Sequence, residues 1–470
     1  MKTPDAFKKI VQIENSVNTK VFIWKSFNTW PLIRKILWLK LIAIDSNNKE
    51  YKKKIILSPF SYIKIVISSI YRMFKKINAR EDAVKLFFSR PEYLQEIYSK
   101  KFIDRIVDPI IDSFCEDEKI TKYYLSKVSK EKKLLHDALY LHQNATFNIL
   151  RLSMEQKETI HEIAKILDLN GYNLERDYKN QLRLFIEWYV SAKKLISKHK
   201  KLKEIYLTCW YLPDMMAICA AASEYGIKTI DIQHGKQGKY QAMYSGWTKI
   251  PEKGYALMPD NFWCWGQPSC NHILTSSPNR KIHIPFIGGY PWINYYKKNL
   301  MKADSDAPKN KIKVLVTMQP PQGQNTERIP DFIIDFLKSN DQVNIHFILR
   351  LHPNDKEGFY YCKNRLRLIN PSLYTIDDGT KNLYDTFLEI SHHITAFSSC
   401  CYEASLFKVP TLLYGDDSRE IYKDDIENKV FTWIKSNKKD LTDWLYSDFD
   451  FKEKVSNQYI YNKENKMKLV

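Results

Sequence analysis

The sequence predicts an α/β protein with two Rossmann-like domains that face each other across a cleft, preceded by a basic helical N-terminal region. Apolar segments typical of strands alternate with helical segments in two series, one after residue 203 and one after residue 312. This alternation predicts βαβ units and parallel sheets. A polar stretch at residues 298–312, which contains Pro308, separates the series and is typical of a linker.

Length and composition agree with this architecture. A chain of 470 residues exceeds an ordinary single domain, and its 44% hydrophobic content suffices for full cores. The eight cysteines lack the spacing of zinc ligands, so we expect reduced thiols and no metal. We expect no cofactor either. The N-terminus has charges where a signal peptide is apolar, and no uncharged apolar run approaches the roughly 18 residues that span a bilayer. We therefore expect a cytoplasmic protein.

The net charge of +19 is concentrated in residues 1–80, where 17 Lys or Arg stand against 4 Asp or Glu. Within this basic region, residues 20–44 and 55–76 combine aromatic, aliphatic and basic side chains, a composition typical of helices that lie on anionic membranes. Helices that pack on the protein body fit the pattern equally well, and both interpretations stay open. The region has no recognised nucleic-acid-binding module, so nucleic acid is not an expected partner.

Residues 81–300 are expected to form the N-terminal, acceptor-side domain, mostly helical from residue 85 to residue 200 and Rossmann-like beyond. Gly226 is a helix-stop signal after an alanine-rich segment. The predicted elements are strands at Glu204–Tyr211, 227–235, Asn261–Gly266 and Lys281–Gly289, and a helix at Pro213–Gly226.

Residues 312–430 are expected to form the C-terminal, nucleotide-donor-binding domain, and residues 431–470 a charged helical tail. The predicted strands are Lys313–Gln319, Val343–Pro353, Leu373–Asp377, His392–Ser399 and Pro410–Gly415, and the predicted helices are Pro330–Lys338, Asn382–Glu389 and Cys401–Phe407.

Three polar motifs stand where predicted strands end: IDIQHG (Ile230–Gly235), LRLHP (Leu349–Pro353) and TAFSSCCYEA (Thr395–Ala404). In an open α/β sheet, ligands bind outside the carboxyl ends of the strands. Together the three motifs point to a nucleotide-type ligand held between two α/β halves.

In the third motif, Ser398 and Ser399 fall at a strand-to-helix turn. Hydroxyls and free backbone N–H groups there suit a phosphate. Glu403, one turn into the helix, could accept hydrogen bonds from ribose hydroxyls. The alternative is that the serines cap the helix and that Glu403 is a favourable charge in its first turn.

In the second motif, Arg350 and His352 lie on the same face of a strand, because side chains alternate. Two basic groups at a strand end can neutralise a phosphate leaving group. Gln319 ends another strand and is expected to line the same cleft. The alternative for His352 is a purely structural histidine. Asp377 belongs to a predicted Asp-Gly turn and is a minor candidate.

In the first motif, Asp231 and Gln233 share one strand face and His234 stands at the exit. His234 is the candidate base for an acceptor hydroxyl, with Asp231 as its candidate orienting partner. Gln233 and Gly235 are candidate acceptor-binding residues, and Gly235 would permit a tight turn. The alternative is that His234 is only a turn residue.

These motifs resemble those of bacterial GT-B glycosyltransferases that build capsules and lipopolysaccharides. A loose group with polysialyltransferases, Kdo transferases and teichoic acid glycerophosphotransferases shows an HP motif and a later Ser-Ser motif, which match His352–Pro353 and Ser398–Ser399. Some members also show an HG motif, which matches His234–Gly235. The resemblance covers about residues 200–420. It implies that His352 and the two serines hold the donor phosphate and that His234 activates the acceptor.

The resemblance implies metal-independent transfer of a sugar from a nucleotide-sugar donor to a capsule or lipopolysaccharide acceptor, either a glycan or a lipid-linked molecule. Residues 1–80 would bind the anionic inner face of the cytoplasmic membrane. Sialyltransferase-like members carry an acidic-acidic-Gly motif before HP, whereas here Asp377–Gly379 follows it, so the general base and the donor stay open. Alternatives are a CDP-alcohol polyol-phosphate transferase, a nucleotide-sugar 2-epimerase-like enzyme, and a non-catalytic membrane-associated assembly factor.

Overall fold

The chain divides into two compact units. The N-terminal unit contains Ala6–Leu41 and the described residues from 82 to Tyr295. The C-terminal unit contains the described residues from Tyr296 onward, together with residues 3–5, 42 and 43. The structure is a computed structural model that describes residues 3–43, 82–97, 100–115, 118–129, 131–145, 150–277, 280–301, 311–319, 328–339, 344–352, 355 and 357–449. Most of the predicted linker at 298–312 lies outside these ranges.

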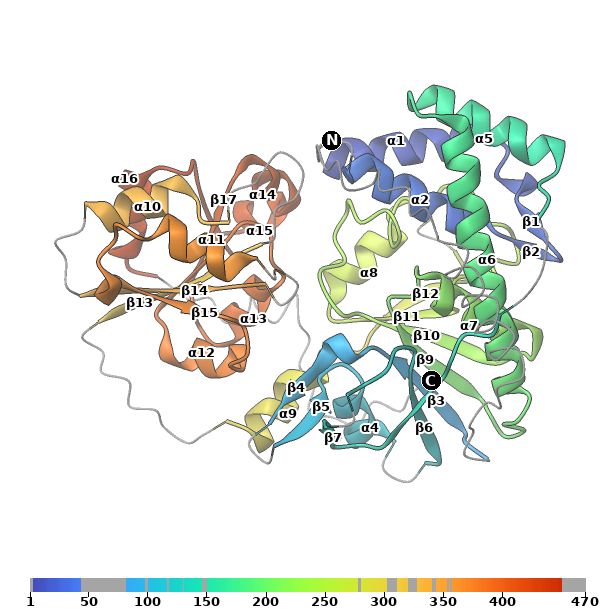
Figure 1. Cartoon of the computed structure of the whole chain (residues 1–470), viewed down its shortest axis with the longest axis horizontal. Coiled ribbons are helices and arrows are strands. Elements are labelled where there is room, and N and C mark those ends of the chain that lie inside the picture. Colours follow the sequence, from blue (N-terminus) through green and yellow to red (C-terminus); the bar gives the residue numbers. More distant parts are fainter. Residues whose placement is uncertain are drawn as a thin grey trace, which may run out of the picture. The chain divides into compact units, whose positions relative to one another are not determined.

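A parallel seven-stranded sheet forms the centre of the N-terminal unit (Figure 1). Its order is β12-β11-β10-β9-β3-β6-β8, so the strand that comes first in the chain lies inside the sheet. The stacked rings of Phe87 and Tyr206, 4.6 Å apart, join the two central strands. The strands are β3 (Lys85–Ser89), β6 (Ile120–Tyr124), β8 (Ala138–Tyr140), β9 (Glu204–Thr208), β10 (Lys228–Ile232), β11 (Asn261–Cys264) and β12 (Ile284–Ile287).

Helices and short strands complete the described part of this unit. Gly226 follows α7 with a φ of +65°, as a helix-stop glycine should. The elements are α1 (Thr3–Ser16), η1 (Thr19–Val21), β1 (Ile23–Trp24), β2 (Phe27–Asn28), α2 (Trp30–Ala43), η3 (Pro91–Tyr93), β4 (Leu94–Glu96), β5 (Lys101–Asp104), α4 (Asp108–Phe114), β7 (Lys133–Leu134), α5 (Met154–Ile166), α6 (Gly171–Ile196), α7 (Pro213–Glu224), α8 (Gln267–Leu274) and α9 (Pro291–Asn299), which reaches into the C-terminal unit.

The prediction of a mostly helical segment from residue 85 to residue 200 is wrong for its first part. Strands β3, β6 and β8 belong to the central sheet, whereas α4, α5 and α6 confirm the helical expectation for their own residues. All five residues of β3 are buried, because the strand is covered on both faces. A short apolar run of this kind has no alternation that distinguishes a buried strand from a buried helix.

The C-terminal unit contains a parallel six-stranded sheet in the order β15-β14-β13-β16-β17-β18. Helices α10, α11 and α16 lie on one side of it, and α12 and α13 on the other (Figure 1). The strands are β13 (Ile312–Thr317), β14 (Ile345–Arg350), β15 (Tyr374–Asp377), β16 (His392–Thr395), β17 (Thr411–Tyr414) and β18 (Thr432–Ile434). The helices are α10 (Asp331–Lys338), α11 (Gly358–Arg365), η4 (Pro371–Leu373), α12 (Leu383–Glu389), α13 (Cys400–Leu406), α14 (Asp416–Ile421), α15 (Lys423–Glu427) and α16 (Lys438–Leu445).

The predicted strands and helices between Lys313 and Gly415 are confirmed in the described residues. The helical tail is only partly correct, because β18 adds a sixth strand at the edge of the sheet before α16 begins. Ile434 of this strand and Leu441 and Trp444 of α16 belong to the apolar core of the unit. The end of the described chain is therefore a structural part of the sheet domain.

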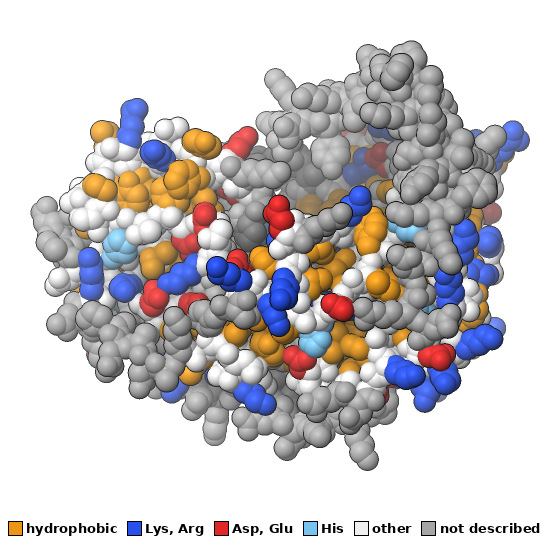
Figure 2. Space-filling view, turned by 60° about the horizontal axis from the view of Figure 1, so that its bottom comes forward, with side chains coloured by type: hydrophobic (Ala, Val, Ile, Leu, Met, Phe, Trp, Pro, Cys, Tyr) orange, Lys and Arg blue, Asp and Glu red, His pale blue; other side chains and the backbone are white. Residues whose placement is uncertain are grey.

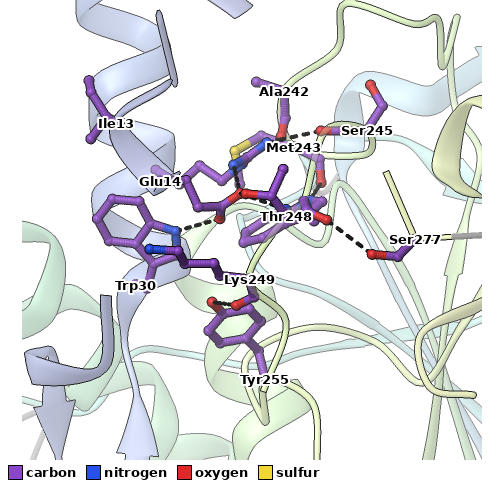
Figure 3. Close-up of polar contacts among 12 residues, drawn as sticks. Ile13, Glu14, Trp30, Ala242, Met243, Ser245, Thr248, Lys249, Tyr255 and Ser277 are labelled. Carbon is purple, nitrogen blue, oxygen red and sulfur yellow. Dashed lines mark hydrogen bonds and ion pairs between the residues drawn. The ribbon is translucent and has the colours of Figure 1, made fainter. Parts of the chain in front are cut away.

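The described part of the basic N-terminal region is anchored by a buried ion pair. Arg34 of α2 and Glu14 of α1 are 2.8 Å apart with no solvent exposure, and Arg34 also donates to the carbonyl oxygens of Ala242 and Ser245. In Figure 3, Glu14 lies between the indole of Trp30 and Thr248, and both donate to its carboxylate. One carboxylate thus connects two N-terminal helices to a loop 234 residues away in the sequence.

For α2, the structure confirms the interpretation that the helix packs on the protein body. Trp30, Leu32, Ile33 and Leu37 are fully buried, and Lys35 is only 8% exposed. The second amphipathic segment, 55–76, lies outside the described residues. No helix that the structure describes is long and apolar enough to cross a bilayer. On the face of the molecule shown in Figure 2, basic, acidic and apolar side chains of the described residues are interspersed.

Replacing Glu14 with Gln should lower the free energy of unfolding of the N-terminal unit by about 3–5 kcal/mol, because Arg34 would keep a buried charge without its partner. Urea denaturation followed by tryptophan fluorescence measures this loss. Asp177→Asn is the matched control, since the Lys40–Asp177 pair is 31% and 30% exposed and should contribute about 1 kcal/mol or less. Equal losses in the two variants would contradict the anchoring role of Glu14.

Candidate functional site

Both sheets have a point where the strand order reverses direction. The first strand of each sheet lies beside the fourth, which places β3 next to β9 in the N-terminal unit and β13 next to β16 in the C-terminal unit. In doubly wound sheets, ligands bind outside the carboxyl ends of the strands at this point. Each unit therefore has one position where functional side chains are expected.

In the N-terminal unit, a thiol stands at this position. Cys209 follows β9 directly, and its Sγ lies 2.9 Å from Nε2 of His234, 3.3 Å from the hydroxyl of Tyr93 and 3.9 Å from that of Tyr211. We call these four residues the Cys209 cluster. Cys209 has a φ of +56°, a left-handed conformation that costs a residue with a Cβ about 1–3 kcal/mol. Such strain persists where the surrounding structure holds the backbone in place.

The carboxylate of Asp231 supplies part of that support. It accepts hydrogen bonds from the backbone N–H of Trp210, at 3.0 Å, and from the hydroxyl of Tyr244, at 2.9 Å. The expectation that Asp231 orients His234 through a direct contact is therefore wrong, because both of its oxygens hold other groups. Burial raises the pKa of Asp231 to about 7, although His234 and these hydrogen bonds oppose the shift.

The charges of Cys209 and His234 stabilise each other. Burial lowers the pKa of His234, but the charge and hydrogen bond of Cys209, the charge of Asp231 and a hydrogen bond with the backbone of Ile232 together raise it to about 9. Burial raises the pKa of the Cys209 thiol, but the charge of His234 and hydrogen bonds from His234 and Tyr93 lower it overall. Both shifts favour a thiolate–imidazolium pair, in which His234 already carries the proton that a base would accept.

Further basic groups lie close to the Cys209 cluster. Arg90 follows β3 and pairs with Asp214 in the first turn of α7, with Nη2 and Oδ2 2.5 Å apart. Lys35 of α2 donates to Gln181, and burial lowers its pKa to about 8. The charge of Cys209 affects the pKa of both Arg90 and Lys35, which shows that the three groups share one environment.

Two buried hydroxyl groups mark the same strand ends. Ser89 ends β3 and Thr208 ends β9, and both are fully buried. Their side chains make no hydrogen bond to any residue that the structure describes. The parallel register pairs Phe88 with Leu207, so continuing it by one residue places Ser89 beside Thr208. Buried polar groups normally have partners, so this pair indicates a place for a water molecule or a ligand group.

Of the two predicted acceptor-binding residues, Gln233 needs correction. Gln233 is 2% exposed; its side chain accepts from the backbone N–H of Trp265 and donates to the carbonyl oxygen of Gly235. It therefore joins the ends of neighbouring strands and is not available to an acceptor. Gly235 lies at a bend without a left-handed φ, and a Cβ there would meet nothing within 4 Å, so its role in binding an acceptor stays a prediction.

In the C-terminal unit, the parallel register brings the predicted donor-binding residues to one edge of the sheet. Thr317 pairs with Arg350 on one side and with Thr395 on the other. Gln319, His352 and the Ser398–Ser399 pair all follow this line of paired residues, at the carboxyl ends of β13, β14 and β16. The sequence thus predicted their shared edge correctly, and their roles stay predictions.

Arg350 is occupied by neighbouring residues. Its guanidinium donates to Asp377 at 2.6 Å and to the carbonyl oxygens of Gly379 and Lys381. Arg350 therefore organises the turn after β15, and the Asp-Gly string serves as its partner. His352 is half-buried, and burial lowers its pKa, so at neutral pH it is an uncharged hydrogen-bonding group. Of the two basic groups predicted to neutralise a phosphate at this strand end, Arg350 is thus paired with Asp377 and His352 is uncharged at neutral pH.

The serine pair is only partly used by the helix that follows. Ser398 Oγ accepts from the backbone N–H of Cys400 at 3.3 Å, as in the capping alternative. Ser399 stands at the N-cap position of α13, but its hydroxyl makes no capping hydrogen bond. Glu403 is 5% exposed and accepts from the hydroxyl of Tyr384 at 2.7 Å, so a ribose would have to compete with this partner. Ser399 is the half-buried hydroxyl left for a ligand.

Sequence reasoning missed Arg90, Tyr93, Cys209 and Tyr211. Arg90 and Tyr93 were missed because β3, which positions them, lies in the segment predicted to be mostly helical. Cys209 and Tyr211 lie inside the predicted strand Glu204–Tyr211, whereas β9 ends at Thr208 and leaves them at its carboxyl end. The string CWY after an apolar run was the available signal. Among the described residues, no group of three or more His, Cys, Asp or Glu side chains is arranged to hold a metal ion.

No protein-family model and no curated protein sequence matches the chain. Among solved structures, a UDP-N-acetylglucosamine 2-epimerase is similar over 81% of this chain and 92% of its own, with 11% identity and a TM-score of 0.50. An S. aureus MnaA–UDP co-structure (12% identity, 81% and 92% covered, TM-score 0.48) and the wall teichoic acid polymerase TagF (13% identity, 85% and 88% covered, TM-score 0.41) are also similar.

At 11% identity the first likeness shows the fold alone, and the TM-scores of the other two are too low to carry an argument. The chain has a GT-B-like α/β fold, with a Rossmann-type parallel sheet in each of its two units. The predicted fold class is thereby confirmed. The cleft between the domains, the domain boundaries and the roles of the site residues stay predictions.

Replacing Asp231 with Asn should reduce stability more at pH 4 than at pH 8. The folded state holds the Asp231 proton up to a pH of about 7, whereas the unfolded chain releases it near 4, so this carboxyl loses up to roughly 4 kcal/mol of its contribution across that interval. Urea denaturation of both proteins from pH 4 to pH 8 measures the difference. A difference that does not change with pH would contradict the raised pKa of Asp231.

Proposed function

We propose that this protein is a metal-independent glycosyltransferase that moves a sugar from a nucleotide-sugar donor to a capsule or lipopolysaccharide acceptor. The observation that carries the proposal is the position of Gln319, His352 and Ser399 around the switch point of a doubly wound sheet. Uncharged donors and hydroxyls at this position suit the phosphates of a nucleotide. The likeness in fold to a UDP-N-acetylglucosamine 2-epimerase supports a nucleotide-sugar ligand.

The acceptor belongs to the other unit in this proposal. The Cys209 cluster, Arg90 and the hydroxyls of Ser89 and Thr208 offer polar groups at the carboxyl ends of β3, β9 and β10. A glycan or a lipid-linked acceptor presents hydroxyls that such groups can bind. The excess of positive charge in residues 1–80 supports an association with the anionic inner face of the cytoplasmic membrane.

A nucleotide-sugar 2-epimerase is the second candidate, since an enzyme with this printed name has a similar fold. It would convert a nucleotide sugar without any acceptor, whereas the glycosyltransferase needs one. A CDP-alcohol polyol-phosphate transferase would use the same phosphate-binding edge with a different donor. A non-catalytic assembly factor would bind no nucleotide.

One nucleotide among CMP, CDP, UDP and GDP should raise the melting temperature of the wild-type protein, because a ligand at 100 times its dissociation constant stabilises the folded state by about 2.7 kcal/mol. His352→Ala and Ser399→Ala should each weaken this shift, since both residues stand at the proposed phosphate-binding edge. Thermal unfolding with each nucleotide is the measurement. Incubation of the wild type with the matching nucleotide sugar alone then distinguishes the two enzymes. An epimerase would convert the nucleotide sugar without an acceptor, whereas a glycosyltransferase would need one.

Ser339→Ala is the matched control. Ser339 follows α10, and its hydroxyl is bound to the carbonyl oxygens of Asp335 and Phe336. The helix returns from the carboxyl edge to the amino edge of the parallel sheet, so Ser339 lies away from the proposed site. Full nucleotide shifts in Ser339→Ala and reduced shifts in Ser399→Ala support the assignment. If no nucleotide raises the melting temperature, the assignment of the nucleotide site is contradicted and the non-catalytic assembly factor is favoured.

A further inference from the structure

Cys209 differs from the other cysteines of the chain in position and in partners. Six of the eight are buried, and only Cys209 and Cys400 are partly exposed. Cys209 stands at the carboxyl end of β9 in a left-handed conformation, 2.9 Å from an imidazole nitrogen. A thiol with a histidine partner at a strained strand end is the arrangement that activates a sulfur.

A second observation indicates that a ligand reaches this position. The hydroxyls of Ser89 and Thr208, fully buried and without partners among the described residues, end the two strands that meet at the switch point. Thr208 directly precedes Cys209. Ile232, two residues before His234, pairs with Thr208 in the parallel register. The unpaired hydroxyls and the thiol–imidazole pair therefore share one end of the sheet.

We propose that Cys209 is a catalytic residue, whose thiolate, held by the His234 imidazolium, accepts the proton of the acceptor hydroxyl. The acceptor substrate in this inference rests on the proposed function, whereas the ion pair of Cys209 and His234 is inferred independently of it. His234 becomes the positioning residue that keeps the sulfur ionised. Asp231 fixes the adjacent backbone of Trp210 and with it the turn that carries the thiol.

The proposed step is balanced without an additional reagent. The acceptor oxygen forms a bond to the anomeric carbon, the bond from that carbon to the donor phosphate breaks, and its electron pair stays on the phosphate. The hydroxyl proton moves to Sγ of Cys209, which becomes a neutral thiol beside the imidazolium. Release of this proton to water restores the thiolate. Proton transfer to a positioned side chain of this kind typically contributes about 100- to 10,000-fold in rate.

Other titratable groups surround the sulfur and will affect its titration. Tyr93 and Tyr211 contact it directly, while Asp231, Tyr244, Arg90 and Lys35 affect it, or are affected by it, through charge. Among the described residues, His234 is the one group that is both within 3 Å of the sulfur and able to carry a positive charge. Removing that charge is therefore the most specific way to test the pair.

Alkylation with iodoacetamide tests the ion pair in the full-length protein. At pH 6.5, Cys209 should react at least tenfold faster than Cys400, the other partly exposed thiol, as peptide mass spectrometry of both sites shows. His234→Gln should abolish this advantage. Because access to the thiol also limits alkylation, the thiolate is measured in parallel by its ultraviolet absorbance as a function of pH. The signal of Cys209 is the difference between the absorbance of the wild type and that of Cys209→Ser. Absence of a thiolate signal at pH 6.5 overturns the pair.

Transfer kinetics test the catalytic role. Cys209→Ser should lower kcat at least 100-fold and shift the acidic limb of the pH profile, while KM for the donor and the melting temperature stay unchanged. Unchanged kcat in Cys209→Ser would overturn the role of the thiolate. If the wild type transfers no sugar from any donor, the proposed function and this catalytic role fail together, whereas the alkylation rates still decide the ion pair.

Discussion

The buried carboxylate of Asp231 is the interaction on which the N-terminal site depends. It lies one strand away from β9, yet it binds the backbone N–H of Trp210 and so fixes the turn that holds Cys209 at a positive φ. A buried carboxylate without partners would be costly, and here two hydrogen bonds satisfy it. The residue that first suggested a catalytic pair with His234 instead determines where the sulfur stands.

The parallel order of the strands determines which side chains can meet. In both sheets the first strand lies inside, so the chain must cross over to the other half of the sheet before the fourth strand forms. Residues that are 119 positions apart, such as Ser89 and Thr208, therefore end neighbouring strands. The same arrangement brings Gln319 and Ser399 to one edge of the second sheet. In this fold, the order of the strands determines which motifs can contribute to the same ligand site.

The N-terminal region shows why composition alone leaves some questions open. A helix with aromatic, aliphatic and basic residues suits both a membrane surface and a protein core. The charge of Arg34 is compatible with the core because Glu14 and the carbonyl oxygens of Ala242 and Ser245 bind it. Those partners are distant in sequence, and nothing in the local pattern of α2 identifies them.

The sequence by itself determined the βαβ alternation from Glu204 onward, the fold class and the strand ends at which polar residues gather, because these depend on local periodicity and on turn residues. It did not determine that β3 is a strand, since a run buried on both faces carries no alternation. Only the tertiary structure decided which polar groups are already occupied. Arg350 and Gln233 have internal partners, whereas Cys209 has a histidine at its sulfur, because hydrogen-bond partners come from neighbouring strands that the sequence does not align.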